Sequence, residues 1–180
     1  QDESQGKIKQ AWEKIKEGER QQKGHNSLMD DIPIALPSTV RAYKLQKRAA
    51  SANFDWPSTD GVYSKVQEEI DELKSAMADL QVLTNDLNHA KLAHVAPTSD
   101  IASIKDNIEE ELGDVFFTLI NLSRHLKVEP ETALRKANSK FEARFRHLEA
   151  WAQQQSLDIS TQQPEVLEEW WQRAKKDLVE

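Results

Sequence analysis

Two pairs of carboxylates stand three residues apart in stretches with helical periodicity: Glu69 with Glu72, and Glu111 with Asp114. This spacing puts both members of a pair on one helix face. Each pair also adjoins apolar residues, so we expect the acids at the edge of a core. If the two helices are antiparallel neighbours, the four carboxylates converge, and they repel one another unless a cation neutralises them. All-oxygen ligation suits Mg²⁺, with Mn²⁺ as a possible substitute.

Two other uses of these acids have to be weighed. A single carboxylate pair on a helix usually belongs to a solvated face. The recurrence of the pair on two consecutive helices makes a metal site about as good an explanation as a solvated face. A diiron helical bundle would require a Glu-x-x-His motif on two helices. None of the five histidines has a glutamate three residues before it, and His89 has only Asp86 there. We therefore set the diiron interpretation aside.

A basic stripe follows the acids along the chain. Lys136, Lys140 and Arg144 are spaced at i, i+4 and i+8 and share one helix face, and Asn138 stands close to it. Facing a carboxylate cluster, such a stripe could hold the far side of a metal-bound polyphosphate. Acidic neighbours such as Glu142 make an ordinary solvated face the better explanation on spacing alone.

The elements that must position these residues are helices. Apolar residues recur at steps of three and four, and no period-two alternation is long enough for a strand. The expected helices span residues 7–23, 38–52, 62–91, 101–126, 130–151 and 164–178. The predicted fold class is all-α, an antiparallel bundle of about five to six helices. We expect an N-terminal helix and linker over residues 1–36 and a catalytic domain with a C-terminal helix over residues 37–180.

The helix expected over residues 38–52 has an apolar side and a basic side. Ser38 is the expected N-cap. The basic side carries Arg41, Lys44, Lys47 and Arg48. The stretch 53–57, with two aromatic residues and a proline, should end the helix.

Composition excludes several classes of function. The chain has 24 Lys and Arg against 31 Asp and Glu, a net charge of −7, which argues against a nucleic-acid binder with a basic surface. Without cysteine, disulfides, thiolate zinc sites and cysteine nucleophiles are impossible. No apolar run approaches the roughly 20 residues of a transmembrane helix, and no signal peptide opens the sequence. We expect a cytoplasmic protein without membrane partners; because residue 1 is Gln, the chain is expected to be a fragment or a processed product.

Taken together, the motifs resemble those of the MazG-type nucleoside triphosphate pyrophosphohydrolases, and specifically the second, C-terminal repeat of two-repeat members. The acidic motifs are carried by residues 69–72 and 109–117, and the basic motif, Lys-Ala-Asn-Ser-Lys-Phe, begins at Lys136. Upstream, Lys44–Arg48 and Phe54–Trp56 also match, as does the stretch from Trp12 to Pro33. The acidic motifs alone are weak, but in order with the basic motif they are specific, and the resemblance covers nearly the whole chain.

The resemblance implies an all-α, usually dimeric, Mg²⁺-dependent enzyme that splits a nucleoside triphosphate into a monophosphate and pyrophosphate. The family's metal-binding positions fall on Glu69, Glu72, Glu111 and Asp114. A metal-oriented triphosphate would be attacked by water, most plausibly at the α-phosphorus. A nucleotide-binding module without turnover and a helical protein-interaction module are the alternatives.

Further positions of the family fall on residues outside the acid motifs. Lys140 and Arg144 correspond to phosphate-contacting cations, and Trp171 with Lys175 resembles a pair that completes the family's site from the last helix. Trp56 and Asn138 are candidates for base or sugar contact, although Trp56 could equally be a core aromatic.

One departure from the family concerns spacing. Here 38 residues separate Glu72 from Glu111, more than the family usually has. Because a helix rises about 1.5 Å per residue, two longer helices and a loop can accommodate the insertion. We therefore expect the far end of the hairpin to be lengthened and the acid face to be spared. The presence of a single repeat is the second departure, and a partner subunit would then help to build the site.

Overall fold

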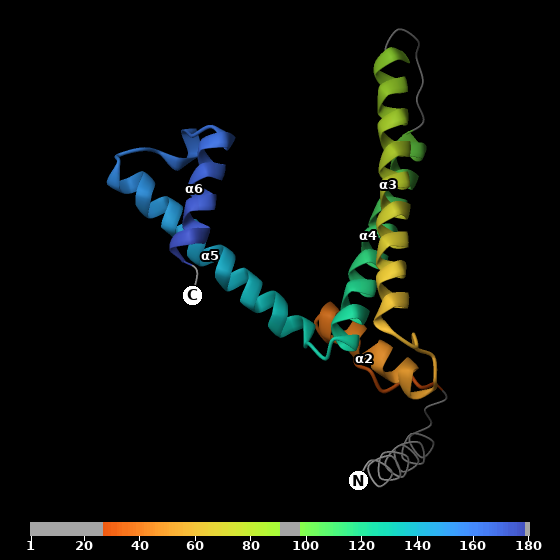
Figure 1. Cartoon of the computed structure of the whole chain (residues 1–180). Helices are drawn as coiled ribbons and strands as arrows, with labels where there is room; N and C mark the ends of the chain where they lie inside the picture. Colours follow the sequence, from red (N-terminus) through yellow and green to blue (C-terminus); the bar gives the residue numbers. More distant parts are fainter. Residues whose placement is uncertain (1–26, 91–97, 179–180) are drawn as a thin grey trace, which may run out of the picture. The chain divides into compact units, whose positions relative to one another are not determined.

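The described part of the chain is helical. The structure is a computed structural model that describes residues 27–90 and 98–178. Within these residues there are five α-helices, one short 3-10 helix and no strand (Figure 1). The all-α prediction is confirmed. The helix expected over residues 7–23 lies outside the described residues.

The helix boundaries follow the sequence signals closely. The elements are α2 (Ser38–Ser51), α3 (Thr59–Ala90), α4 (Thr98–His125), α5 (Pro130–Gln154), η1 (Ile159–Thr161) and α6 (Pro164–Asp177). α4 begins three residues earlier than expected. Pro130 and Pro164 each open a helix, where the missing N–H of proline costs nothing. None of the helices in these ranges has the length and apolar character needed to cross a membrane.

The start of α2 differs from the prediction. Ser38 is already helical, and Pro37 with its extended backbone (ψ 139°) occupies the N-cap position. No side chain caps this end, and the Pro37 carbonyl accepts the first helical bond from the Arg41 N–H at 2.9 Å. The prediction that Ser38 is the N-cap was wrong. A capping residue needs a non-helical backbone, and Pro37, not Ser38, has that backbone here. At the other end Asn53 turns the chain with a left-handed φ of 63°.

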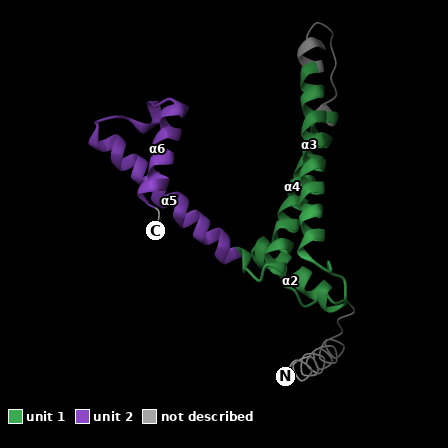
Figure 2. Cartoon of the chain, viewed as in Figure 1, with its two compact units in different colours: residues 1–130 green, residues 131–180 purple. Residues whose placement is uncertain are grey.

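The chain divides into two compact units, residues 1–130 and 131–180 (Figure 2). In the first unit α3 and α4 pack against each other as an antiparallel pair, and α2 packs on α4. Its core includes Val62, Ala76, Val115 and Ile120. The second unit contains most of α5 together with η1 and α6, around Leu148, Ala152 and Ala174.

The long α3–α4 pair explains the unusual spacing of the acids. α3 has 32 residues and α4 has 28. α3 continues to Ala90, well past Glu72, and α4 begins at Thr98, well before Glu111. Both helices therefore extend well past the acids at the far end of the hairpin, as predicted, and both acid motifs remain on facing stretches of the two helices.

Candidate metal and nucleotide site

Three carboxylates from two helices meet on the α3–α4 pair. One oxygen each from Glu69, Glu111 and Asp114 can be chosen so that all lie within 4.8 Å of one another. Glu69 is buried, with 5% of its surface exposed, while Glu111 is half-buried and Asp114 exposed. We call these three residues the acid cluster. It brings together residues 45 positions apart in the sequence, which only the antiparallel packing makes possible.

Glu72, the fourth predicted ligand, lies beside the cluster and is exposed. Its carboxyl shares a hydrogen bond with that of Glu69, which raises the pKa of Glu72; desolvation and the charges of Glu69 and Glu111 add to the rise, and Lys65 opposes it. A neighbouring carboxylate disfavours the ionised form of the group beside it. The raised pKa of Glu72 therefore reflects its position beside Glu69 and Glu111.

Lys65 is a cation of α3 that reaches the cluster. Its Nζ lies 2.9 Å from Glu69 and 2.8 Å from Glu68. Hydrogen bonds to Glu68 and then Glu69 raise the pKa of Lys65 well above its usual value. The i, i+4 spacing of Lys65 and Glu69 was visible in the sequence, so this partner could have been found there.

The acid cluster fits a hard divalent cation. Its donors are all carboxylate oxygens, which suit Mg²⁺, Mn²⁺ or Ca²⁺ better than zinc or copper. Their mutual spacing allows one ion to contact all three residues. A bound cation would also offset the repulsion from Glu69 and Glu111 that adds to the raised pKa of Glu72.

A cavity of about 710 Å³ opens beside the acid cluster, and Glu69, Asp114 and Lys65 form part of its wall. The other walls come from α2, from the connection between α2 and α3, and from α4. The lining includes the largely apolar or aromatic residues Met29, Leu45, Phe54, Trp56 and Phe117. Small-molecule sites commonly have this size and this combination of apolar walls with a few charged groups.

Trp56 lies over the first turn of α3. A β-carbon built on Gly61 would lie 2.6 Å from Cε3 of the Trp56 ring, so only glycine leaves room for the ring. Trp56 is 43% exposed and lines the cavity. It is therefore a wall of the cavity and not a buried core aromatic. By contrast, nothing lies within 4 Å of a β-carbon built on Gly113, so that glycine makes no close helix contact.

Gln46 is a buried polar residue of the cavity wall that sequence reasoning missed. It is 6% exposed, and its Nε2 donates to the Phe117 carbonyl at 2.7 Å. Its Oε1 is buried without a hydrogen-bond partner among the described residues. Buried polar atoms are normally satisfied, and the bond that Gln46 does form ties α2 to α4 at the cavity wall.

Asp55 organises the connection that carries Trp56. Its carboxylate accepts from both terminal nitrogens of Arg124, at 2.9 Å for the Nη1–Oδ2 pair, and lies 3.0 Å from Nε2 of His125. The Trp56 N–H donates to the same carboxylate at 2.9 Å. The bond from Arg124 is the main reason that the pKa of Asp55 falls to about 2. This group fixes the connection against the end of α4.

The predicted phosphate-binding residues lie in the second unit. Within it Arg144 stands over the Trp171 ring, with Cζ 5.8 Å from the ring centroid, and Phe141 packs on the same ring at 5.2 Å. The structure thus brings together Arg144 from α5 and Trp171 from α6. Lys136, Asn138 and Lys140 are exposed on α5, and Lys175 is half-buried on α6.

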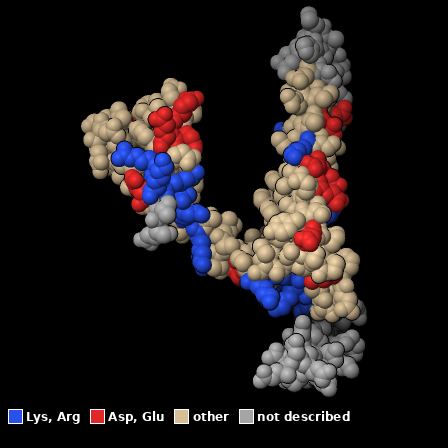
Figure 3. All heavy atoms as spheres, in the orientation of Figure 1, with Lys and Arg blue, Asp and Glu red and all other residues tan. Residues whose placement is uncertain are grey.

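Charge is distributed differently over the two units. Figure 3 shows acidic side chains grouped on the α3–α4 pair and basic side chains along α5. The basic stripe and the acid cluster belong to different units, and their convergence stays a prediction.

Comparison with known proteins agrees with this site. The MazG nucleotide pyrophosphohydrolase domain matches residues 59–149, which include the whole acid cluster. Over 178 residues the chain is 39% identical to a nucleoside triphosphate pyrophosphohydrolase of Escherichia coli, covering 99% of this chain and 60% of that protein. Over 164 residues it is 34% identical to the nucleoside triphosphate pyrophosphohydrolase/pyrophosphatase MazG of Thermotoga maritima, covering 91% and 54%.

A third relative is the uncharacterised protein YabN of Bacillus subtilis, which is 32% identical over 165 residues. The match covers 92% of this chain and 29% of YabN. The chain spans 60% of the Escherichia coli relative and less of the other two. The domain match covers half of this chain and contains the helix pair that carries the acids. The chain belongs to the MazG nucleotide pyrophosphohydrolase family.

Proposed function

We propose that this protein hydrolyses nucleoside triphosphates to nucleoside monophosphates and pyrophosphate with Mg²⁺ as the metal. The observation that carries the proposal is the acid cluster at the wall of a cavity of about 710 Å³. The cluster supplies ligands for a metal that binds phosphates, and the cavity beside it has room and apolar surface for a nucleoside. The names of the two pyrophosphohydrolase relatives point to the same reaction.

The residues divide the work according to their chemistry. Glu69, Glu111 and Asp114, with Glu72 beside them, hold the metal, which when bound neutralises and orients the triphosphate. Trp56 offers a flat, half-exposed surface for a base or sugar. Gln46, bonded to the Phe117 carbonyl, holds the α2 wall of the cavity against α4.

Cations of the second unit complete the proposed site. Arg144 and Lys140 of α5, with Lys136 and Asn138 on neighbouring turns, are assigned to the phosphates. Trp171 and Lys175 extend this surface from α6. Lys and Arg stabilise the charge that develops on the leaving pyrophosphate.

We also propose that the protein acts as a homodimer, with the site near the interface. On α4, Phe116 is 59% exposed, and Phe117 and Leu119 are each 43% exposed, whereas Ile120 is buried. Apolar residues thus occupy more than one face of this helix. A second copy that covers the exposed ones would remove them from water.

A panel of common nucleoside triphosphates, assayed for pyrophosphate with Mg²⁺ and with EDTA, tests the proposal. We expect pyrophosphate and the monophosphate in equal amounts, only with metal. Inorganic phosphate and diphosphate as products would contradict it. Tight binding of a non-hydrolysable triphosphate without turnover of any substrate would indicate a binding module instead.

A further inference from the structure

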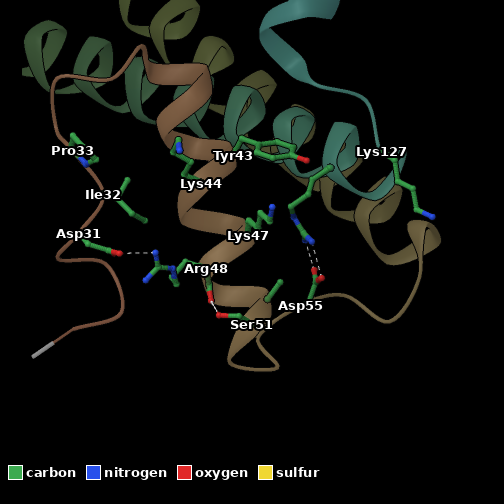
Figure 4. Close-up of a pocket in the computed structure, with 12 residues that line it drawn as sticks. Asp31, Ile32, Pro33, Tyr43, Lys44, Lys47, Arg48, Ser51, Asp55 and Lys127 are labelled. Carbon is green, nitrogen blue, oxygen red and sulfur yellow. Dashed lines mark hydrogen bonds and ion pairs between the residues drawn. The ribbon is translucent and has the colours of Figure 1, made fainter. Parts of the chain in front are cut away.

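A second cavity, of about 820 Å³, shares Asp55 and Arg124 with the cavity beside the acid cluster. It is formed by α2, the segment that precedes α2 and the end of α4 (Figure 4). Five of its lining residues are cationic: Lys44, Lys47, Arg48, Arg124 and Lys127. Only Asp31 and Asp55 are acidic. We call it the basic pocket, and none of the acid-cluster residues lines it.

The two arginines form the fixed wall of the basic pocket. Arg48 Nη2 lies 2.9 Å from Asp31 and its Nη1 donates to the Leu28 carbonyl at 3.2 Å. Arg124 is held by Asp55. The arginine side chains are only 22% and 14% exposed. Anchored in this way, the guanidinium groups lose little freedom when an anion binds, and both acids of the pocket are already engaged.

The three lysines supply the uncompensated charge. Lys44, Lys47 and Lys127 are exposed, and none of them forms an ion pair with a carboxylate of residues 27–90 or 98–178. Lys44 and Lys47 are three residues apart on α2, and Lys127 approaches from the end of α4. Like charges gathered in a concave site favour a bound anion, because the repulsion among them is then relieved.

Lys127 is an unusual residue for its backbone conformation. Its φ is 58°, and it follows α4 at the point where the Val128 N–H bonds back to the Ser123 carbonyl at 2.8 Å. Glycine normally occupies this left-handed position at a helix end because a side chain strains it. Lys127 lines the pocket and holds a strained backbone conformation, which is typical of residues at functional sites.

We propose that the basic pocket is an anion site, separate from the acid cluster, for a small molecule with two or more phosphate groups. Two phosphates can each contact an anchored arginine and a free lysine. Ile32, Pro33 and Tyr43 provide a partly apolar wall for the organic part of such a ligand. Binding requires no metal, since the cations belong to the protein.

Calorimetric titration with inorganic tripolyphosphate in EDTA at low salt tests the site. Wild-type protein should bind saturably, and the double variant Lys47→Gln/Lys127→Gly should bind at least tenfold more weakly, because charge-assisted contacts are lost. Glu111→Gln should bind like the wild type even if it is inactive, so the outcome is independent of the proposed hydrolysis. No saturable binding to the wild type would overturn the proposal.

Two control variants locate the site. Lys74→Gln/Lys105→Gln removes the same charge from exposed positions outside the pocket and should leave affinity within about twofold. Lys140→Gln/Arg144→Gln removes two of the three cations of the basic stripe on α5 and should also leave affinity within that range. If this variant alone lost binding, the basic pocket would be excluded.

Two further measurements complete the test. One distinguishes a binding role of Lys127 from a purely structural role, and the other distinguishes a small phosphate ligand from a nucleic acid. Lys127→Gly alone should weaken tripolyphosphate binding while its Tm equals or exceeds that of the wild type, because the strained φ is relieved. A lower Tm together with unchanged affinity would mean that Lys127 has only a structural role, contrary to the proposal. Tighter binding of a short single-stranded oligonucleotide than of tripolyphosphate would also contradict it, since the ligand would then be a nucleic acid.

Discussion

Replacement of Glu111 by glutamine tests whether the acid cluster binds a metal, because it removes a charge and nearly keeps the shape of the side chain. The variant removes one of the three charged groups whose oxygens lie within 4.8 Å of one another. We expect weaker binding of Mg²⁺ and a fall in pyrophosphate release of about a hundredfold or more. Changes to residues that merely support a metal ligand already cost about 10- to 100-fold.

The same variant has a predictable effect on stability without metal. Two unit charges 4.8 Å apart repel by about 0.9 kcal/mol in water and about 3.5 kcal/mol at an effective dielectric constant of about 20. Because Glu111 is only half-buried, we expect the unfolding free energy in EDTA to rise by about 1 kcal/mol. For a chain of this length that corresponds to a Tm higher by about 2–4 °C.

The assay combines a Mg²⁺ titration of pyrophosphate release with thermal melts in EDTA. Glu110→Gln is the matched control, since Glu110 is an exposed neighbour about 100° around α4. Its activity should stay near the wild-type value. If the two variants were equally active, or if Glu111→Gln melted below the wild type in EDTA, the reasoning about the cluster would be refuted.

Three further predictions concern the walls of the site and the assembly. Gly61→Ala should raise KM for the triphosphate several-fold because the new β-carbon displaces Trp56; an unchanged KM would argue against Trp56 as a contact. Asp55→Asn should lower the unfolding free energy at pH 7 by about 1 kcal/mol after discount for solvent screening. Because the pKa of Asp55 is lowered to about 2 from 3.8, chiefly by Arg124, this difference should disappear as pH falls through that window, and a constant difference would exclude the ion pair as its cause. Sedimentation should give about twice 20.6 kDa, with Phe116→Glu monomeric; a wild-type monomer at micromolar concentration would contradict the dimer.

Much of the fold follows from local signals. The three- and four-residue periodicity gives α3 and α4, and Pro130 and Pro164 mark two helix starts within one residue. The i, i+3 spacing finds both acid motifs. Their meeting across 38 intervening residues needed only the assumption of an antiparallel hairpin.

The remainder of the site depends on contacts that periodicity cannot supply. Asp55 pairs with Arg124, which is 69 residues away, and nothing in either local sequence identifies the other. Gln46 lies on the otherwise apolar side of α2 and bonds to a backbone carbonyl of α4. The basic face of α2 was visible in the sequence, but its closure into a pocket depends on the position of Lys127 after α4. Such pairings are set by tertiary packing, so they require a structure.

The central claim is that the acid cluster and its cavity direct water to the α-phosphorus of a nucleoside triphosphate. Turnover in ¹⁸O-labelled water, with both products analysed by mass spectrometry, tests this claim most directly. The account predicts one ¹⁸O in the nucleoside monophosphate and none in the pyrophosphate, because the new P–O bond forms on the phosphorus that stays with the nucleoside. Label in the pyrophosphate, or a nucleoside diphosphate as the product, would contradict it.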